Sequence, residues 1–252
     1  MEFRKEQERC GIKKMYVDLQ GQLQELGIKR GRDAVFDVAR ANDLLVKKTK
    51  LYHITTDSKH FFFKSPNLIK DILPSRAEQA FAADITYIRL ENDWAYLALV
   101  TDLYSKKIMG YKLADNMKAD MVQEALQMAR KNCIYKRKKI IHHSDRGIQY
   151  CCPQYAGFAK DNGFKLSTTE QYDPYENAVA ERINGILKYE FGLVNTIPNL
   201  ELAYKMVHQA VEIYNNKRRH WSLNLMTPSD AHRKQKHEYV SYKRGVDHRK
   251  KC

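Results

Sequence analysis

The order of residue patterns in the middle of the chain limits the fold most strongly. Three segments within residues 83–115 alternate apolar with polar residues and are rich in β-branched and aromatic side chains, namely "ADITYIRL", "WAYLALVTDLY" and "KIMGYKLAD". This pattern is typical of β-strands. Only short turns, at residues 91–93 and near Ser105, separate the segments. We therefore expect three consecutive strands to pair as an antiparallel meander.

Helical and strand patterns alternate after this meander. A helix is predicted from about residue 119 to 131, a strand over 138–143, a helix that begins at Pro153, and a fifth strand in "GFKLSTT". Two further helices are predicted over residues 178–191 and 199–219. A meander followed by strands that alternate with helices predicts an α/β fold, in which helices flank both faces of a mixed five-stranded sheet.

The first 73 residues show helical patterns only. Apolar residues spaced by three and four form one stripe, made of Ile12, Met15, Leu19, Leu23 and Leu26. A second apolar pattern follows at residues 31–46, and Gly27 and Gly31 lie between the two. Two short helices around a glycine-containing turn indicate a helix-turn-helix-like DNA-binding region over residues 1–73, with a linker that ends near Pro74.

The charge of the chain indicates a polyanionic partner. Lysine and arginine number 44 against 30 acidic residues, a formal net charge of +14, and such an excess attracts nucleic acid. The last 20 residues hold eight basic and two acidic side chains. This C-terminal region, assigned to residues 236–252, is either a solvated tail or a basic arm that lies along DNA phosphates.

Cysteines and apolar runs exclude several other classes of protein. The five cysteines are odd in number and form no Cys-x-x-Cys pair, so we expect reduced thiols and no structural zinc site. No run of about 18 apolar residues is present, and the N-terminus lacks the apolar core of a signal peptide. We therefore expect no membrane segment and a protein of the bacterial cytoplasm or nucleoid.

Three acidic residues are placed so that the predicted fold can bring them together. Asp84 lies early on the first strand, Asp145 ends the fourth strand, and Glu181 lies in the first turn of a helix. Two carboxylates about 4 Å apart repel by roughly 4 kcal/mol at an effective dielectric of about 20. We therefore predict bound Mg²⁺ or Mn²⁺, with two ions clamping a phosphodiester. The alternative for Asp145 is that it only caps a turn.

The helix that carries Glu181 has one polar face. Glu181, Asn184, Gly185 and Lys188 lie at i, i+3, i+4 and i+7, whereas Glu190 is about half a turn out of phase and points away. A metal ligand and a phosphate-binding lysine on one face would suit DNA. The alternative is an ordinary amphipathic surface helix.

Other polar residues beside these elements have two interpretations each. His142 and His143 precede Asp145, and we expect one imidazole to point inward and one outward. They either orient Asp145 from the second shell of ligands or bind a metal themselves. Asp102 is a further acid at a strand end, and we expect it to order the turn before Ser105.

A basic cluster ends the last long helix. Arg218 and Arg219 follow Asn215 and Asn216 in "YNNKRRH". Cations at a helix C-terminus interact favourably with the helix dipole. In a polar cluster of this kind, however, we expect the two arginines to contact DNA.

Several motifs, in this order, resemble the integrase-type core of bacterial insertion-sequence transposases: "DITYI", "TDLYSKKIMGY", "HHSDRGIQY", "YENAVAERINGILKYEF" and "YNNKRRH". The chain looks most like the second-frame product of the family whose transposase is encoded in two overlapping frames, over residues 10–235. The resemblance implies a ribonuclease H-like fold for residues 74–235. It also implies a DDE triad at Asp84, Asp145 and Glu181, and DNA contacts at Gln149, Asn177 and Lys188. One departure is Glu176, where the family usually has Asp.

The resemblance also implies a reaction and partners. A DDE transposase cuts DNA at the element ends and joins the freed 3′-hydroxyl to target DNA, with Mg²⁺ or Mn²⁺ as cofactor. The expected partners are double-stranded DNA, further copies of the chain in a homo-oligomer, and a first-frame helix-turn-helix protein, bound or fused. Two alternatives stay open: a ribonuclease H-like nuclease that cuts without joining, and a non-catalytic DNA-binding regulator of transposition.

Overall fold

A five-stranded mixed sheet forms the centre of the protein, in a computed structural model that describes residues 6–7, 9–46, 61–70, 72–135, 139–170 and 177–234. The strands are β1 (Ala80–Arg89), β2 (Trp94–Asp102), β3 (Ile108–Ala114), β4 (Ile140–Ser144) and β5 (Phe164–Thr168). Their order is β3-β2-β1-β4-β5. The first three strands pair antiparallel, and β4 and β5 add in parallel. The predicted mixed sheet is confirmed.

The central strand β1 has two unequal neighbours. It pairs with β2 over nearly its whole length, from Phe81 opposite Asp102 to Arg89 opposite Trp94. Its parallel pairing with β4 covers only residues 80–82. The remainder of β1 therefore runs past the end of β4, and Asp84 lies two residues beyond Ala82, the last residue of β1 that pairs with β4.

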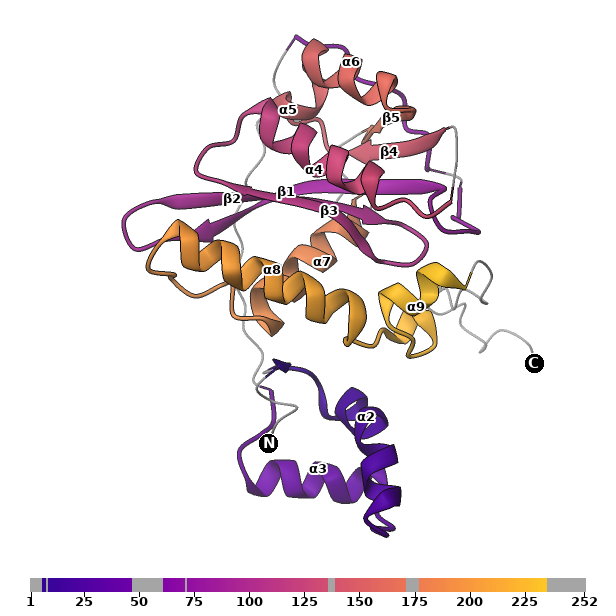
Figure 1. Ribbon diagram of the computed structural model, residues 1–252, viewed down its shortest axis with the longest axis vertical. Helices are drawn as coiled ribbons and strands as arrows, with labels where there is room; N and C mark the ends of the chain where they lie inside the picture. Colours follow the sequence, from indigo (N-terminus) through magenta and orange to yellow (C-terminus); the bar gives the residue numbers. More distant parts are fainter. Residues whose placement is uncertain are drawn as a thin grey trace, which may run out of the picture.

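Helices cover both faces of the sheet (Figure 1). One face carries α4 (Ala119–Lys131), α5 (Ile148–Cys151) and α6 (Pro153–Asp161), and the other carries α7 (Ala178–Glu190), α8 (Leu200–Asn216) and α9 (Pro228–Arg233). Helix α4 approaches β3 so closely at Gly110 that a Cβ there would lie 2.1 Å from the Ala125 carbonyl oxygen. No helix in these described ranges combines the length and the apolar content needed to span a bilayer.

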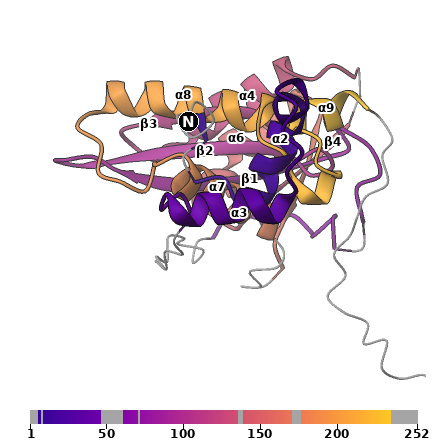
Figure 2. The same ribbon diagram turned by 90° about the horizontal axis from the view of Figure 1, so that it is seen from below.

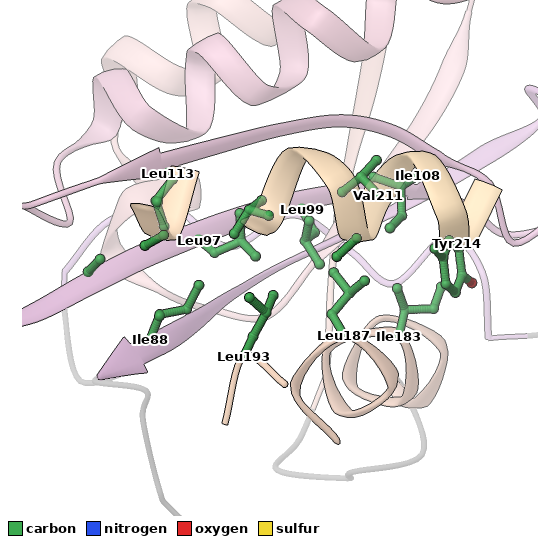
Figure 3. Close-up of a cluster of buried hydrophobic side chains, with 14 of the residues drawn as sticks. Ile88, Leu97, Leu99, Ile108, Leu113, Ile183, Leu187, Leu193, Val211 and Tyr214 are labelled. Carbon is green, nitrogen blue, oxygen red and sulfur yellow. The ribbon is translucent and has the colours of Figure 1, made fainter. Parts of the chain in front are cut away.

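Each face of the sheet has its own apolar core. Figure 3 shows the core under α7 and α8, which joins strand side chains to both helices. Its labelled members include Leu97, Leu99, Ile183, Leu187, Val211 and Tyr214. The opposite core packs Phe81 and Val100 against Val122 and Leu126 of α4. Because β2 is covered on both faces, its interior is buried almost without interruption.

The N-terminal region contains α2 (Ile12–Glu25) and α3 (Arg32–Ala41), which lie in front of the core in Figure 2. Gly27, at a φ of +67°, turns the chain after α2 in a conformation that favours glycine. A small core forms around Ile12, Met15 and Ala39. The predicted stripe is buried only at its start, since Leu26 is 72% exposed.

A buried polar network secures the turn after β2. One Asp102 carboxylate oxygen accepts the backbone N–H groups of Tyr104 (2.9 Å) and Ser105 (2.7 Å), and the other accepts that of Glu78 (2.6 Å). His232 of α9, a helix that the sequence patterns did not predict, lies 2.9 Å from the Ser105 hydroxyl and 3.2 Å from Glu78. The prediction that Asp102 orders this turn is confirmed.

Candidate active site

Three carboxylates meet where β1 runs past the end of β4. Asp84 lies on β1, Asp145 directly follows β4, and Glu181 lies in the first turn of α7, which packs against β1. Burial raises the pKa of Asp84 and of Glu181, and the charge of Asp145 raises both further. The predicted convergence of the three acids is therefore visible in their electrostatics.

Asp84 has a strongly raised pKa. Burial, followed by the charges of Asp145 and Glu181, raises its pKa to about 7. Two hydrogen bonds oppose this rise: the Asn184 amide donates to Oδ2 at 2.7 Å, and the Ile85 backbone N–H donates to Oδ1 at 2.9 Å. Desolvation and like charge outweigh both bonds, so without a cation Asp84 is only about half ionised at neutral pH.

Asp145 both caps a turn and faces the other acids. The Gly147 backbone N–H donates to its Oδ1 at 3.0 Å, which closes a turn between β4 and α5. A Cβ at residue 147 would lie 3.0 Å from that same oxygen, so a larger residue would crowd it. The two interpretations of Asp145 from the sequence are thus compatible.

Asn184 belongs to this site, although the sequence patterns marked it only as part of a polar helix face. It is 5% exposed, and its side-chain nitrogen is the one that bonds Asp84. Its side-chain oxygen is buried without a hydrogen-bond partner among the described residues. The spacing of three residues from Glu181 was the signal that could have identified it.

The carboxylate oxygens of the site are ligands of the kind that divalent cations such as Mg²⁺ prefer. Three carboxylates supply hard oxygen ligands, and burial together with the charge of Asp145 raises the pKa of Asp84 and of Glu181. Burial lowers the pKa of Lys188, a cation on the same face of α7 as Glu181, and the charge of Asp84 acts in the opposite direction. Within the described residues, however, no three His, Cys, Asp or Glu side chains are already arranged around a common ion position.

The two histidines that precede Asp145 are consecutive residues of β4 and therefore point to opposite faces of the sheet. Both are fully buried. His142 contacts the Tyr155 hydroxyl, and burial, with a smaller contribution from His143, lowers its pKa to about 3. The His143 Nδ1 lies 2.8 Å from the Ser167 hydroxyl on β5. The prediction that one imidazole would point outward is wrong, because both are buried.

Gln149 and Asn177, two predicted DNA contacts, both donate from their side-chain amides to backbone carbonyls. The Gln149 side chain donates to the Met117 carbonyl at 3.2 Å and is partly exposed. Asn177 is 7% exposed and donates to the Ala83 carbonyl at 3.2 Å, so it holds the start of α7 to β1. Gln149 remains a proposed DNA contact, whereas we now propose a structural role for Asn177.

The basic cluster after α8 is engaged by acids of the protein itself. Arg218, with a side chain only 3% exposed, forms two 2.7 Å hydrogen bonds to Glu190. Arg219 pairs with Asp18 of α2, and Lys217 pairs with Glu6. Arg218 is therefore a structural residue in this arrangement, because its guanidinium is not accessible to DNA. Contact between Arg219 and DNA would require Asp18 to release it.

Lys188 keeps the position expected for a residue that binds phosphate. It lies on the face of α7 that carries Glu181 and Asn184, and its side chain is partly buried. Burial lowers its pKa, and the charge of Asp84 partly opposes this effect. The ammonium group of Lys188 therefore interacts electrostatically with Asp84.

Comparisons with known proteins identify the family of the chain. Two models described as integrase core domains match residues 74–174 and 162–228. The chain is 33% identical over 227 residues to an insertion element IS600 31 kDa protein of Shigella sonnei. The alignment covers 88% of this chain and 82% of the relative. The chain belongs to the insertion-sequence DDE transposases with an integrase core. The transposase InsF of IS3A from Escherichia coli is 29% identical over 92% of this chain and 80% of its own length.

Solved structures agree on the fold of this transposase. A simian T-cell lymphotropic virus intasome contains a chain that matches with a TM-score of 0.55 at 15% identity, over 88% of this chain and 70% of its own. The HTLV-2 integrase catalytic core domain in complex with magnesium matches with a TM-score of 0.50 at 18% identity, over 62% of this chain and 97% of its own. The predicted ribonuclease H-like fold is confirmed.

Proposed function

We propose that this transposase cleaves DNA at the ends of its insertion sequence and joins the freed 3′-hydroxyl to target DNA. The observation that supports the proposal most directly is the meeting of Asp84, Asp145 and Glu181 at the end of β4, with the pKa of Asp84 raised to about 7. Acids that repel one another in this way favour a cation between them. Perturbed carboxyl groups are also common at catalytic centres.

In this proposal Asp84, Asp145 and Glu181 hold the metal. Mg²⁺ or Mn²⁺, in two bound ions, would activate the attacking oxygen and stabilise the leaving oxygen of the phosphodiester. The Asn184 amide keeps the Asp84 carboxylate oriented on β1, and the Gly147 N–H does the same for Asp145. Both acids would thus lose little freedom when a cation binds.

Lys188 would position the DNA. It lies seven residues after Glu181, or two helical turns, which span roughly 10 Å. From there its side chain would reach a phosphate next to the scissile one while Glu181 holds metal. Water would be the first nucleophile and the freed 3′-hydroxyl the second, so no serine or tyrosine of the protein needs to form a covalent intermediate.

The assembly around the DNA is part of the proposal. One structural neighbour is a viral intasome, and we infer that this transposase also acts as a homo-oligomer on double-stranded DNA. A first-frame helix-turn-helix protein would contribute recognition of the element ends. The two N-terminal helices are available for a similar role, and residues 236–252, outside the described residues, for phosphate contacts. We expect this assembly in the bacterial cytoplasm, with the nucleoid.

A strand-transfer assay tests the function. Purified protein is incubated with labelled element ends and Mg²⁺, with and without the first-frame partner, and cleaved and joined products are separated. Wild type is expected to make both products, whereas Asp84→Asn and Asp145→Asn bind DNA but make neither. Cleavage without joining would support the nuclease alternative. DNA binding without either product, in both conditions, would support the non-catalytic regulator.

A further inference from the structure

An aromatic patch lies at the end of the β1–β2 hairpin, at the edge of the α4 core, against which Tyr96 packs. Tyr87 packs edge-on against Trp94 at 6.2 Å and against Tyr96 at 5.1 Å between ring centroids. The Arg89 guanidinium carbon lies 4.8 Å from the centre of the Trp94 ring. Trp94 is 37% exposed, and Arg89 is also exposed. We call these four residues the hairpin patch.

The hairpin patch lies on the face of the sheet that α4 covers elsewhere. Side chains alternate along a strand, so Tyr87 and Arg89 share the face of Phe81, which is packed against the α4 core. Helix α4 begins only at Ala119, and the β1–β2 turn extends beyond it in Figure 1. At this end of the sheet Trp94 and Arg89 are exposed, whereas Tyr87 and Tyr96 are partly buried.

Contacts connect the hairpin patch to the acid site. The Tyr87 hydroxyl lies 3.9 Å from the Met117 sulfur, and the Met117 carbonyl accepts the Gln149 amide at 3.2 Å. The Gln149 and Asp145 side chains flank the same glycine, Gly147. Along β1, Tyr87 lies three positions after Asp84, so the two side chains point to opposite faces of the sheet. The link to the acids is therefore through Met117 and Gln149, and DNA that extends from Asp145 past Gln149 would come close to the hairpin patch.

The charges near the hairpin patch decide which part of DNA fits there. Arg89 is its one cation, and the turn beside it carries two exposed acids, Glu91 and Asp93. A phosphate would gain little from this balance. A nucleobase is uncharged and stacks on aromatic rings and on guanidinium planes.

We propose that Tyr87, Arg89, Trp94 and Tyr96 form a stacking platform for an unpaired base of the DNA next to the scissile phosphate. The inference rests on the proposed function for its DNA substrate. The competing explanation is that these side chains only stabilise the hairpin, because Tyr87 is paired with Tyr96 and Arg89 with Trp94 across the two strands.

Intrinsic fluorescence tests the platform directly, because the chain has only two tryptophans, Trp94 and Trp221. Trp221→Phe leaves Trp94 as the sole reporter. Trp94→Phe leaves Trp221, which is 44% exposed and serves as a matched control. Titration with a single-stranded oligothymidylate is expected to quench the first protein and leave the second unchanged. Trp94→Ala should weaken binding of this oligonucleotide by about tenfold.

The salt dependence of binding sharpens the test. Since the platform holds a base, the slope of log K against log salt should be the same in Trp94→Ala and in wild type. A slope that changes would overturn base stacking in favour of phosphate contact. Unchanged affinity in Trp94→Ala, together with a lower melting temperature, would show that the cluster only stabilises the hairpin.

The outcomes for the platform and for the proposed function are separable. Unquenched Trp94 in a protein that still cleaves and joins element ends would overturn the platform and leave the function intact. Quenching of Trp94 in a protein that neither cleaves nor joins would support the platform and overturn the function.

Discussion

The pKa values of two glutamates on α7 shift in opposite directions. Burial raises the pKa of Glu181, at the start of the helix, and the charge of Asp145 raises it further. Burial would also raise the pKa of Glu190, at the end of the helix, but the hydrogen bonds and charge of Arg218 lower it. The helix thus places one acid against other acids and the other acid in a bidentate ion pair.

The difference suggests a structural role for Glu190 and a ligand-binding role for Glu181. Glu190 and Arg218 satisfy each other within the protein, and the pair joins the end of α7 to the end of α8. Asp84 and Glu181 instead have a raised pKa, to which the charge of Asp145 contributes. Removing an acid should therefore weaken the fold at one end of α7 and relieve repulsion at the other.

The largest effect is expected from the matched pair Glu181→Gln and Glu190→Gln. Glu181→Gln should lower strand transfer by more than the about 100-fold that loss of an outer-shell metal partner costs. It should leave the melting temperature unchanged or raised. Glu190→Gln should lower the free energy of unfolding by about 3 kcal/mol, because the buried Arg218 loses its partner, while the folded fraction keeps its activity.

Measurements on these two variants can contradict the roles assigned to Glu181 and Glu190. Urea unfolding and strand transfer are measured on both proteins under one set of conditions. A stable but inactive Glu190→Gln protein, beside an active Glu181→Gln protein, would show that the two ends of α7 have the reverse roles.

The pH dependence of the free energy of unfolding should reveal the raised pKa of Asp84. Its pKa is about 7 in the folded protein against 3.8 for an ordinary aspartate, so between these values the folded state holds a proton that the unfolded state has lost. The free energy of unfolding therefore falls as pH rises through this window. Relative to Asp84→Asn, wild type should lose about 2 to 3 kcal/mol between pH 5 and pH 8.

Metal should cancel this loss, since a bound cation favours the ionised carboxylate. Added Mg²⁺ should raise the melting temperature of wild type more at pH 8 than at pH 5, and should have little effect on Asp84→Asn. Equal pH slopes in the two proteins would show that Asp84 titrates normally.

Lys188 allows a finer test of the catalytic end of α7. Lys188→Glu should reduce joining by at least about tenfold, because a misplaced substrate can lose about 100-fold in rate. Because the Lys188 side chain is partly buried, Lys188→Gln, which removes the charge and keeps most of the length, controls for lost packing. Joining rates and melting curves of Lys188→Gln and Lys188→Glu are compared; wild-type joining in Lys188→Glu would leave the lysine without a role in positioning DNA.

The smallest effect is expected from the C-terminal tail, which lies outside the described residues. Deletion of residues 238–252 removes five lysine and arginine side chains. If these lie along duplex phosphates, the slope of log K against log salt should flatten by about 0.9 for each lost contact. An unchanged slope would identify the segment as a solvated tail.

The sequence alone predicted the mixed sheet, the convergence of Asp84, Asp145 and Glu181, and the opposite direction of Glu190. These conclusions follow from local regularities. Alternation identifies strands, a spacing of three and four identifies a helix face, and strand ends locate polar side chains. The family motifs support the same three acids.

Only the tertiary structure decided what each polar side chain contacts. His142 and His143 are both buried, one against Tyr155 of α6 and the other against Ser167 of β5, and no local period reveals these neighbours. Arg218 binds Glu190, 28 residues away in the sequence, and Arg219 binds Asp18, 201 residues away. Partners so distant along the chain are brought together by the packing of whole elements. A basic cluster that was expected to contact DNA therefore became, for Arg218, part of the fold.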